Sequence, residues 1–186
     1  MATNWLKKVA PHDAAMHAAF AALCTESDYG RLSRAAFNQK AAQLTGVPAA
    51  EVAKGIAAET HINTELVEYA RTLRQRGQRL ACLSNGTQEW TMQVITDYGL
   101  GDIFEEVVLS GDLGMVKPHP EIYLHTLKKL GVPAAEAIFV DDRQSNVISA
   151  EACGMRGIVF QDTASFVQEL DTTYAPQPSS PGKARP

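Results

Sequence analysis

The chain has 186 residues, of which 45% are hydrophobic, 20% charged and 7% aromatic. A chain of this length and composition is typical of about one globular domain with a small inserted subdomain, and it is unlike a disordered or disulfide-stapled chain. Seventeen Lys and Arg residues against 21 Asp and Glu residues give a formal net charge of −4, which argues against a nucleic-acid partner.

Cellular location can also be inferred from composition. No window of about 18 consecutive apolar residues occurs, so we expect neither a membrane partner nor a secretory signal. Cys24, Cys82 and Cys153 are odd in number and widely spaced, which favours reduced thiols over disulfides or a zinc site. These features predict a cytoplasmic protein.

Residues 1–62 are predicted to form a small helical region. Alanine is abundant there and β-branched residues are few, which favours helices, and we expect two or three short ones before residue 60. One helix is predicted to begin after Ser33, a favourable N-cap residue, and to end at Gly46.

Residues 63–170 show a different pattern, which predicts an α/β fold. A helix is expected from Thr64 to Gly77, and short apolar runs then occur at residues 80–83, 107–109, 137–140 and 157–160. Runs of this kind that alternate with helices indicate a doubly wound parallel sheet, whose chemistry lies at the carboxyl ends of the strands. The tail, residues 171–186, holds four of the nine prolines and is predicted to be disordered.

Polar side chains follow the first two runs. Ser84 and Asn85 come directly after the first, where a hydroxyl and backbone N–H groups can bind an anion; the alternative is a helix cap. Lys117 follows the second run and precedes a helix expected from Pro120. Its ammonium group can neutralise a phosphate or carboxylate, whereas an isolated lysine is usually a surface charge.

Two adjacent carboxylates, Asp141 and Asp142, follow the third run. Buried neighbouring carboxylates repel one another, and a hard cation such as Mg²⁺ relieves that repulsion. Asn146 lies one helical turn beyond Asp142 and is expected to face the same point. The alternative is a helix N-cap followed by a first-turn carboxylate.

In these three sets of polar residues the sequence resembles the haloacid dehalogenase (HAD) superfamily, in particular its phosphatase-like members with an N-terminal helical cap. Ser84 matches the second family motif, Lys117 the third, and Asp141-Asp142 with Asn146 the fourth. The resemblance implies a doubly wound HAD-like sheet with a small helical cap. It also implies a Mg²⁺-dependent phosphatase that acts on a small phosphorylated metabolite, and the Asp pair disfavours the metal-free dehalogenase branch.

The resemblance also implies roles for these residues. Ser84 and Lys117 would be catalytic: Ser84 would donate a hydrogen bond to a phosphoryl oxygen, and Lys117 would offset charge on the phosphate and the nucleophile. Asp142 would ligate Mg²⁺ with help from Asp141, and Asn146 would support them. Asn85 is expected to bind phosphate together with Ser84 and Lys117.

The family's first motif, which carries the nucleophilic Asp at the end of the central first strand, is missing. Its nearest mimic, Asp28-Tyr29-Gly30, is rejected because no apolar strand precedes it. A phosphoaspartate cannot form without that Asp, so the chain is expected to be inactive. Without the central strand, either something else fills the gap or the chain folds poorly.

Two readings of this loss remain open. The first is an enzyme truncated at its N-terminus, whose complete form is the phosphatase. The second is a non-catalytic phosphate- and metal-binding pseudoenzyme or regulatory module. A third class, an interaction protein that uses the cap helices, has no positive support. Neither the substrate nor the oligomeric state follows from the sequence.

Overall fold

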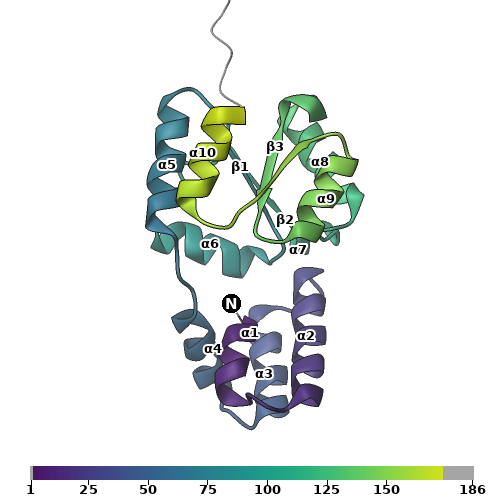
Figure 1. The fold of residues 1–186 in the computed structure, drawn as a ribbon. Coiled ribbons are helices and arrows are strands. Elements are labelled where there is room, and N and C mark those ends of the chain that lie inside the picture. The colour runs from purple at the N-terminus through teal and green to yellow at the C-terminus, as the bar shows by residue number, and fades with distance from the viewer. Residues whose placement is uncertain (1, 174–186) are drawn as a thin grey trace, which may run out of the picture.

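The computed structural model describes residues 2–173 of the chain. Four N-terminal helices form a bundle at one end, and short parallel strands alternate with helices in the remainder (Figure 1). No helix in this range is long and apolar enough to cross a membrane. The predicted division at residue 62 remains a prediction.

We call the N-terminal bundle the helical cap. It consists of α1 (Ala2–Val9), α2 (Ala14–Asp28), α3 (Arg34–Thr45) and α4 (Ala49–Ala58). The expectation of two or three helices before residue 60 is therefore wrong by one.

Local capping explains where these helices begin and end. The carboxylate of Asp13 accepts a hydrogen bond from the backbone N–H of Met16 at 2.8 Å, and this starts α2 separately from α1. Ser33 caps α3 in the same way through Ala36, and Gly46 ends α3 with a φ of 73°, so both predicted boundaries are confirmed.

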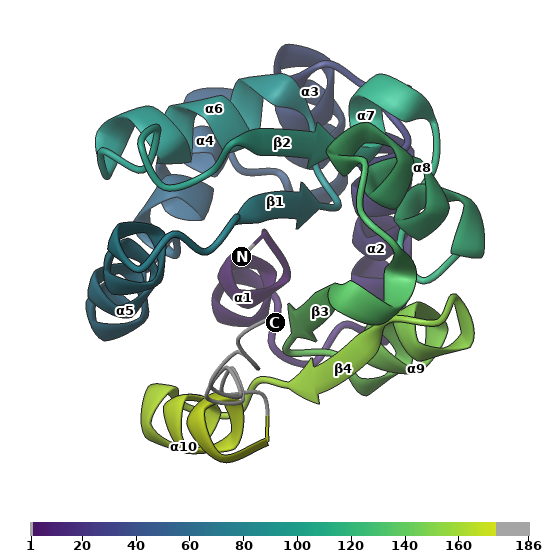
Figure 2. The same ribbon diagram turned by 90° about the horizontal axis from the view of Figure 1, so that it is seen from above.

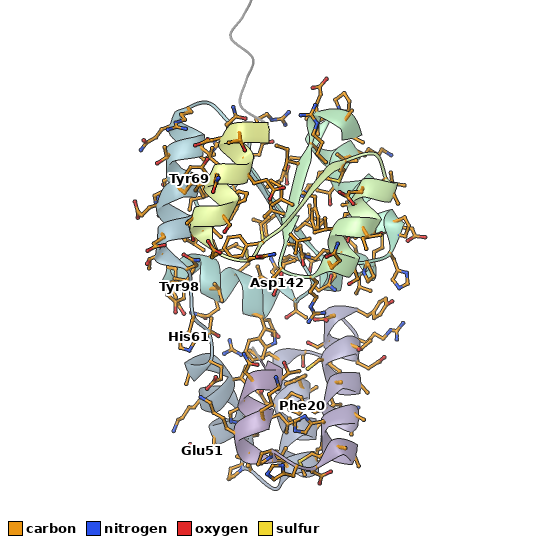
Figure 3. All side chains as sticks on the ribbon, in the orientation of Figure 1. Phe20, Glu51, His61, Tyr69, Tyr98 and Asp142 are labelled. Carbon is orange, nitrogen blue, oxygen red and sulfur yellow. The ribbon has the colours of Figure 1, made fainter. Side chains whose placement is uncertain are left out.

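A closely packed aromatic core holds the cap together. Trp5 packs against Phe20, and Phe20 against Phe37, with ring centroids 5.8 and 5.6 Å apart. Phe20 lies inside the bundle (Figure 3). Gly55 of α4 lies so close to the indole of Trp5 that a Cβ there would be 2.1 Å from Nε1. Glycine is therefore required for α4 to approach Trp5 closely.

The α/β part comprises all elements after the cap. They are α5 (Thr64–Gln75), β1 (Ala81–Ser84), α6 (Gln88–Asp97), β2 (Glu106–Leu109), α7 (Ser110–Leu113), α8 (Pro120–Leu130), η1 (Ala134–Glu136), β3 (Ile138–Asp141), α9 (Gln144–Ala152), β4 (Arg156–Val159) and α10 (Thr163–Thr173). The strands coincide closely with the four predicted apolar runs. The tail predicted from residue 171 overlaps the end of α10, and residues 174–186 lie outside the described residues.

The predicted doubly wound sheet, whose central first strand was expected to be missing, is present as two separate parallel pairs. In one pair, β1 and β2 align Ala81 with Glu106 and Ser84 with Leu109. In the other, β3 and β4 align through Asp141 and Val159. The two pairs lie on opposite sides of the α/β part when it is viewed from above (Figure 2). Between β1 and β3, the described residues provide no strand that would join the pairs.

The close contact between α4 and Trp5 makes a testable prediction. Gly55→Ala places a methyl group against the indole, and we expect it to lower the free energy of unfolding by about 1–3 kcal/mol, as overpacking usually does. Alanine alone would favour the helix by about 1 kcal/mol, so a loss identifies the contact as its cause. Urea unfolding followed by tryptophan fluorescence measures the change.

Gly101→Ala is the matched control, because a Cβ added there would have no atom within 4 Å and the φ of Gly101 is not positive. Equal stability changes in the two variants would contradict the packing described for α4.

Candidate functional site

Lys117 connects the two strand pairs at their carboxyl ends. Its Nζ donates a hydrogen bond to the backbone carbonyl of Leu83 in β1 at 2.8 Å and to Oδ2 of Asp141 in β3 at 2.6 Å. The side chains of Lys117 and Asp141 are only 11% and 7% exposed, so this ion pair is largely shielded from water. The structure thus brings together the ends of the first and third predicted strands.

Asn85 holds the backbone of Lys117 in place. Its Nδ2 donates to the carbonyl of Lys117 at 2.9 Å, and its Oδ1 accepts from the backbone N–H of Lys117 at 2.8 Å. The side chain predicted to bind phosphate is therefore engaged in positioning the lysine.

Asp141 is held at its second oxygen as well. Its Oδ1 accepts hydrogen bonds from the backbone N–H of Arg143 and from Nδ2 of Asn146, each at 2.9 Å. The carbonyl of Asn146 in turn accepts from the hydroxyl of Tyr123. The amide of Asn146, expected to face the same point as Asp142, is thus hydrogen-bonded to Asp141.

These contacts determine the charge state of Asp141. Burial is the largest single effect and raises the pKa of this carboxyl group, whereas the hydrogen bond and the positive charge from Lys117 lower it. The donors on Arg143 and Asn146 act in the same direction, so the pKa of Asp141 is lowered. The site therefore contains a carboxylate whose charged form is favoured by the donors around it.

Ser84 and Asp142 remain available to a ligand. Ser84 is the last residue of β1 and half-buried, and its hydroxyl has no hydrogen-bond partner within residues 2–173. Asp142 follows β3, is exposed, and lies on the side of the α/β part that faces the cap (Figure 3). A hydroxyl donor and a free carboxylate are thus present at the strand ends that Lys117 connects.

The donor set is compatible with Mg²⁺ but supplies few ligands. Mg²⁺ is usually held by one or two carboxylates together with substrate phosphate, and it retains several waters. Asp142 offers a free carboxylate, whereas both oxygens of Asp141 are already hydrogen-bonded. Within residues 2–173, no group of three or more His, Cys, Asp or Glu residues could hold a metal ion. A cation here would depend on Asp142, water and a bound anion.

The cap contacts the α/β part close to this site. The fully buried hydroxyl of Ser110 donates to the backbone carbonyl of Asp28 at 2.5 Å and accepts from the N–H of Gly86 at 2.9 Å. A Cβ on Gly30 would be 2.0 Å from the carbonyl oxygen of Gly111, so glycine is needed for this close approach. Sequence analysis gave no signal for Ser110, since its partners are remote in the chain.

Asp28 ends α2, which confirms that no strand precedes it, yet its carboxyl lies within electrostatic range of the site. Burial raises the pKa of Asp28, and the positive charges of Arg143 and Lys117 counteract part of that rise. The residue rejected as a motif mimic is therefore still a neighbour of the candidate site.

Comparison with known proteins identifies the class to which this fold and site belong. The chain belongs to the haloacid dehalogenase-like hydrolase family, and the sequence model of that family matches residues 7–154. A sesquiterpene phosphatase of Aspergillus oryzae is 31% identical over 137 residues, which are 72% of this chain and 69% of that protein. A phosphoglycolate phosphatase of Nitrosococcus oceani is 32% identical over 98 residues, 52% of this chain but only 43% of that protein.

Solved structures support the same fold. A HAD family enzyme of Bacteroides thetaiotaomicron in complex with magnesium superposes with a TM-score of 0.70 at 19% identity, covering 90% of this chain and 89% of that one. The L-2-haloacid dehalogenase of Xanthobacter autotrophicus gives a TM-score of 0.62 at 18% identity, covering 95% and 78%. At these identities the likeness establishes the fold alone.

The buried ion pair predicts a pH-dependent contribution to stability. Asp141→Asn leaves Lys117 without its counter-charge, and we expect it to lower the free energy of unfolding by about 3–5 kcal/mol near pH 7. The pKa of Asp141 is lowered in the folded protein, so the pair's contribution is fully present above the ordinary carboxyl pKa of about 4 and is lost as the pH falls through the folded value. Denaturant unfolding across this pH range measures the difference.

The control is Glu51→Gln, which removes a carboxylate from the exposed Lys54–Glu51 pair and should cost less than about 1 kcal/mol. A penalty for Asp141→Asn that stayed constant between pH 7 and acid conditions would contradict the assigned ion pair.

Proposed function

We propose that this site binds the phosphoryl group of a small phosphorylated metabolite together with Mg²⁺, and that the complete form of the protein is a phosphomonoester phosphatase. The observation that carries the proposal is the arrangement of Lys117, bonded to both strand ends, beside the unpartnered hydroxyl of Ser84 and the free carboxylate of Asp142. Membership of the hydrolase family and similarity to proteins named as phosphatases support it.

Each residue has a role that follows from its chemistry. The Ser84 hydroxyl donates a hydrogen bond to a phosphoryl oxygen, and the Lys117 ammonium offsets the negative charge of the phosphate. Asp142 holds Mg²⁺, which when bound neutralises further phosphate charge and orients the phosphoryl group. Asn85 and Asn146 are positioning residues, because their amides fix Lys117 and Asp141.

Catalysis by this chain as printed is not expected. Both oxygens of Asp141 are held by donors, and Asp142 is assigned to the cation, so neither is free to attack phosphorus. The Ser84 hydroxyl is bonded to no base within the described residues, and a serine without one is a weak nucleophile. The alternative function, a non-catalytic phosphate- and metal-binding module, rests on the same missing nucleophile.

Turnover provides the first test. Purified as printed, the chain is expected to hydrolyse p-nitrophenyl phosphate in the presence of Mg²⁺ no faster than its Lys117→Ala variant. The reason is that an ammonium group accelerates the reaction only where a nucleophile is in place. Hydrolysis that is lost in Lys117→Ala would refute the proposed absence of a nucleophile.

Ligand binding provides the second test, and its outcome does not depend on turnover. Calorimetric titration with inorganic phosphate should show binding that is stronger with Mg²⁺ than without it. Ser84→Ala removes a hydrogen bond to a charged ligand and should weaken binding by about 10- to 100-fold. Asp142→Asn should abolish the difference between titrations with and without Mg²⁺.

Glu136→Gln serves as the control, because it removes an exposed carboxylate from η1 and should leave both titrations unchanged. Phosphate binding that is unaffected by Ser84→Ala and by Mg²⁺ would exclude the proposed site.

A further inference from the structure

Asp28 lies where the cap meets the α/β part, and backbone contacts hold it there. It is the last residue of α2, and its carbonyl accepts the hydrogen bond from the buried hydroxyl of Ser110. Ser110 also accepts from the N–H of Gly86, in the turn that follows β1. The close approach of Gly30 to Gly111 holds the chain just beyond α2. The backbone of Asp28 therefore has a fixed position beside the candidate site.

The side chain of Asp28 lies on the inner face of α2. Asp28 is one helical turn beyond Cys24, so the two side chains share a face of the helix, and Cys24 packs against the aromatic core of the cap. Burial is the largest effect on the pKa of Asp28 and raises it, whereas the positive charges of Arg143 and then Lys117 lower it. The carboxylate thus lies under the cap and within electrostatic range of two cations of the α/β part.

Neither Asp28 nor Arg143 has a partner for its charged group. Within residues 2–173 the Asp28 carboxylate accepts no hydrogen bond and forms no ion pair within 4.0 Å, and the same holds for the donors of the exposed Arg143 guanidinium. Arg31, the basic residue nearest to Asp28 in the sequence, is paired with Glu26 at 2.8 Å. A ligand group that enters between Asp28 and Arg143 would therefore meet two unused and opposite charges.

Asp28 is unfavourable for the stability of the ligand-free protein. A negative charge at the C-terminal end of a helix opposes the helix dipole, and α2 has no basic residue in its last turn to offset it. A half-buried carboxylate without a hydrogen bond also loses hydration without compensation. Residues that break such rules without local compensation are expected at functional sites. A ligand that donates a hydrogen bond to Asp28 would remove part of this cost.

We propose that Asp28 and Arg143 select a phosphate ester whose organic part carries a hydroxyl group near the phosphate, as in a polyol or sugar phosphate. A carboxylate only accepts hydrogen bonds and a guanidinium only donates them, whereas a hydroxyl does both and therefore suits either group. A second carboxylate on the ligand would be repelled by Asp28, and an ammonium group by Arg143 and Lys117. This inference rests on the proposed function, because the phosphoryl group must first bind beside Ser84 and Lys117.

The experiment compares glycerol 3-phosphate with n-propyl phosphate, which has the same carbon chain but lacks the hydroxyl groups. Both are titrated calorimetrically in the presence of Mg²⁺, together with inorganic phosphate. We expect glycerol 3-phosphate to bind about tenfold or more tightly than n-propyl phosphate, which is the gain that a hydrogen bond to a charged group provides.

Variants of the chain test which residues cause this preference. Asp28→Ala and Arg143→Ala should each reduce it, and the second variant retains the backbone N–H that binds Asp141. Because the preference is a ratio of two dissociation constants, a general electrostatic effect of the lost charge cancels. Glu136→Ala is the control, since it removes an exposed carboxylate from η1 and should leave the preference unchanged.

Thermal unfolding separates selection of a ligand from a structural role. Asp28→Ala should not lower the melting temperature, because it removes a charge that α2 disfavours. A preference that is lost only together with a fall in melting temperature would assign a structural role to Asp28 and overturn the inference.

Two further outcomes would overturn it while leaving the proposed function intact. One is a chain that binds inorganic phosphate but does not distinguish the two esters, and the other is a preference that persists in Asp28→Ala. A chain that binds neither inorganic phosphate nor the esters would overturn this inference and the proposed function together.

Discussion

The ion pair between Lys117 and Asp141 is the contact on which the arrangement of the α/β part depends. The ammonium group of Lys117 also donates a hydrogen bond to the carbonyl of Leu83, so one side chain connects the two strand pairs at their carboxyl ends. In a conventional parallel sheet, backbone hydrogen bonds between neighbouring strands provide this connection. Here a largely buried ion pair does so, and removing either partner would leave an uncompensated charge.

This connection leaves the two faces of the space between the pairs unequal. On the face covered by α8 and α9, Leu83 packs against a cluster that contains Tyr123 and Phe139, so β1 and β3 share a hydrophobic core. On the face covered by α5 and α10, the strands border an apolar groove of about 480 Å³ instead. Tyr69 and Phe166, which form an edge-to-face ring contact, tie the two helices together across that groove.

The helical cap is less affected by the split sheet, because its core is self-contained. Its aromatic side chains pack mainly on one another, and Trp90 of α6 extends the cluster into the α/β part through Phe37. Together with the contact of Ser110 with the end of α2, this places the cap over the strand ends. A ligand at Ser84 and Asp142 would therefore lie close to the cap, which is the part of the chain best placed to select it.

The sequence by itself determined the elements and the chemistry at their ends. Apolar runs predicted all four strands, capping residues such as Ser33 and Gly46 predicted helix ends, and polar residues after the runs singled out the candidate site. These are local properties, set by the period of side chains along a strand or helix and by the conformations that individual residues favour.

Only the tertiary structure decided which of those residues contact one another. The two adjacent carboxylates have different surroundings: Asp141 is enclosed by donors from three segments, whereas Asp142 is exposed, and spacing alone could not distinguish them. Asn85 and Ser110 owe their roles to partners more than 20 residues away. The pairing of β1 with β2 and of β3 with β4 is likewise a property of how distant segments pack, because hydrogen bonding between strands is not encoded within either strand.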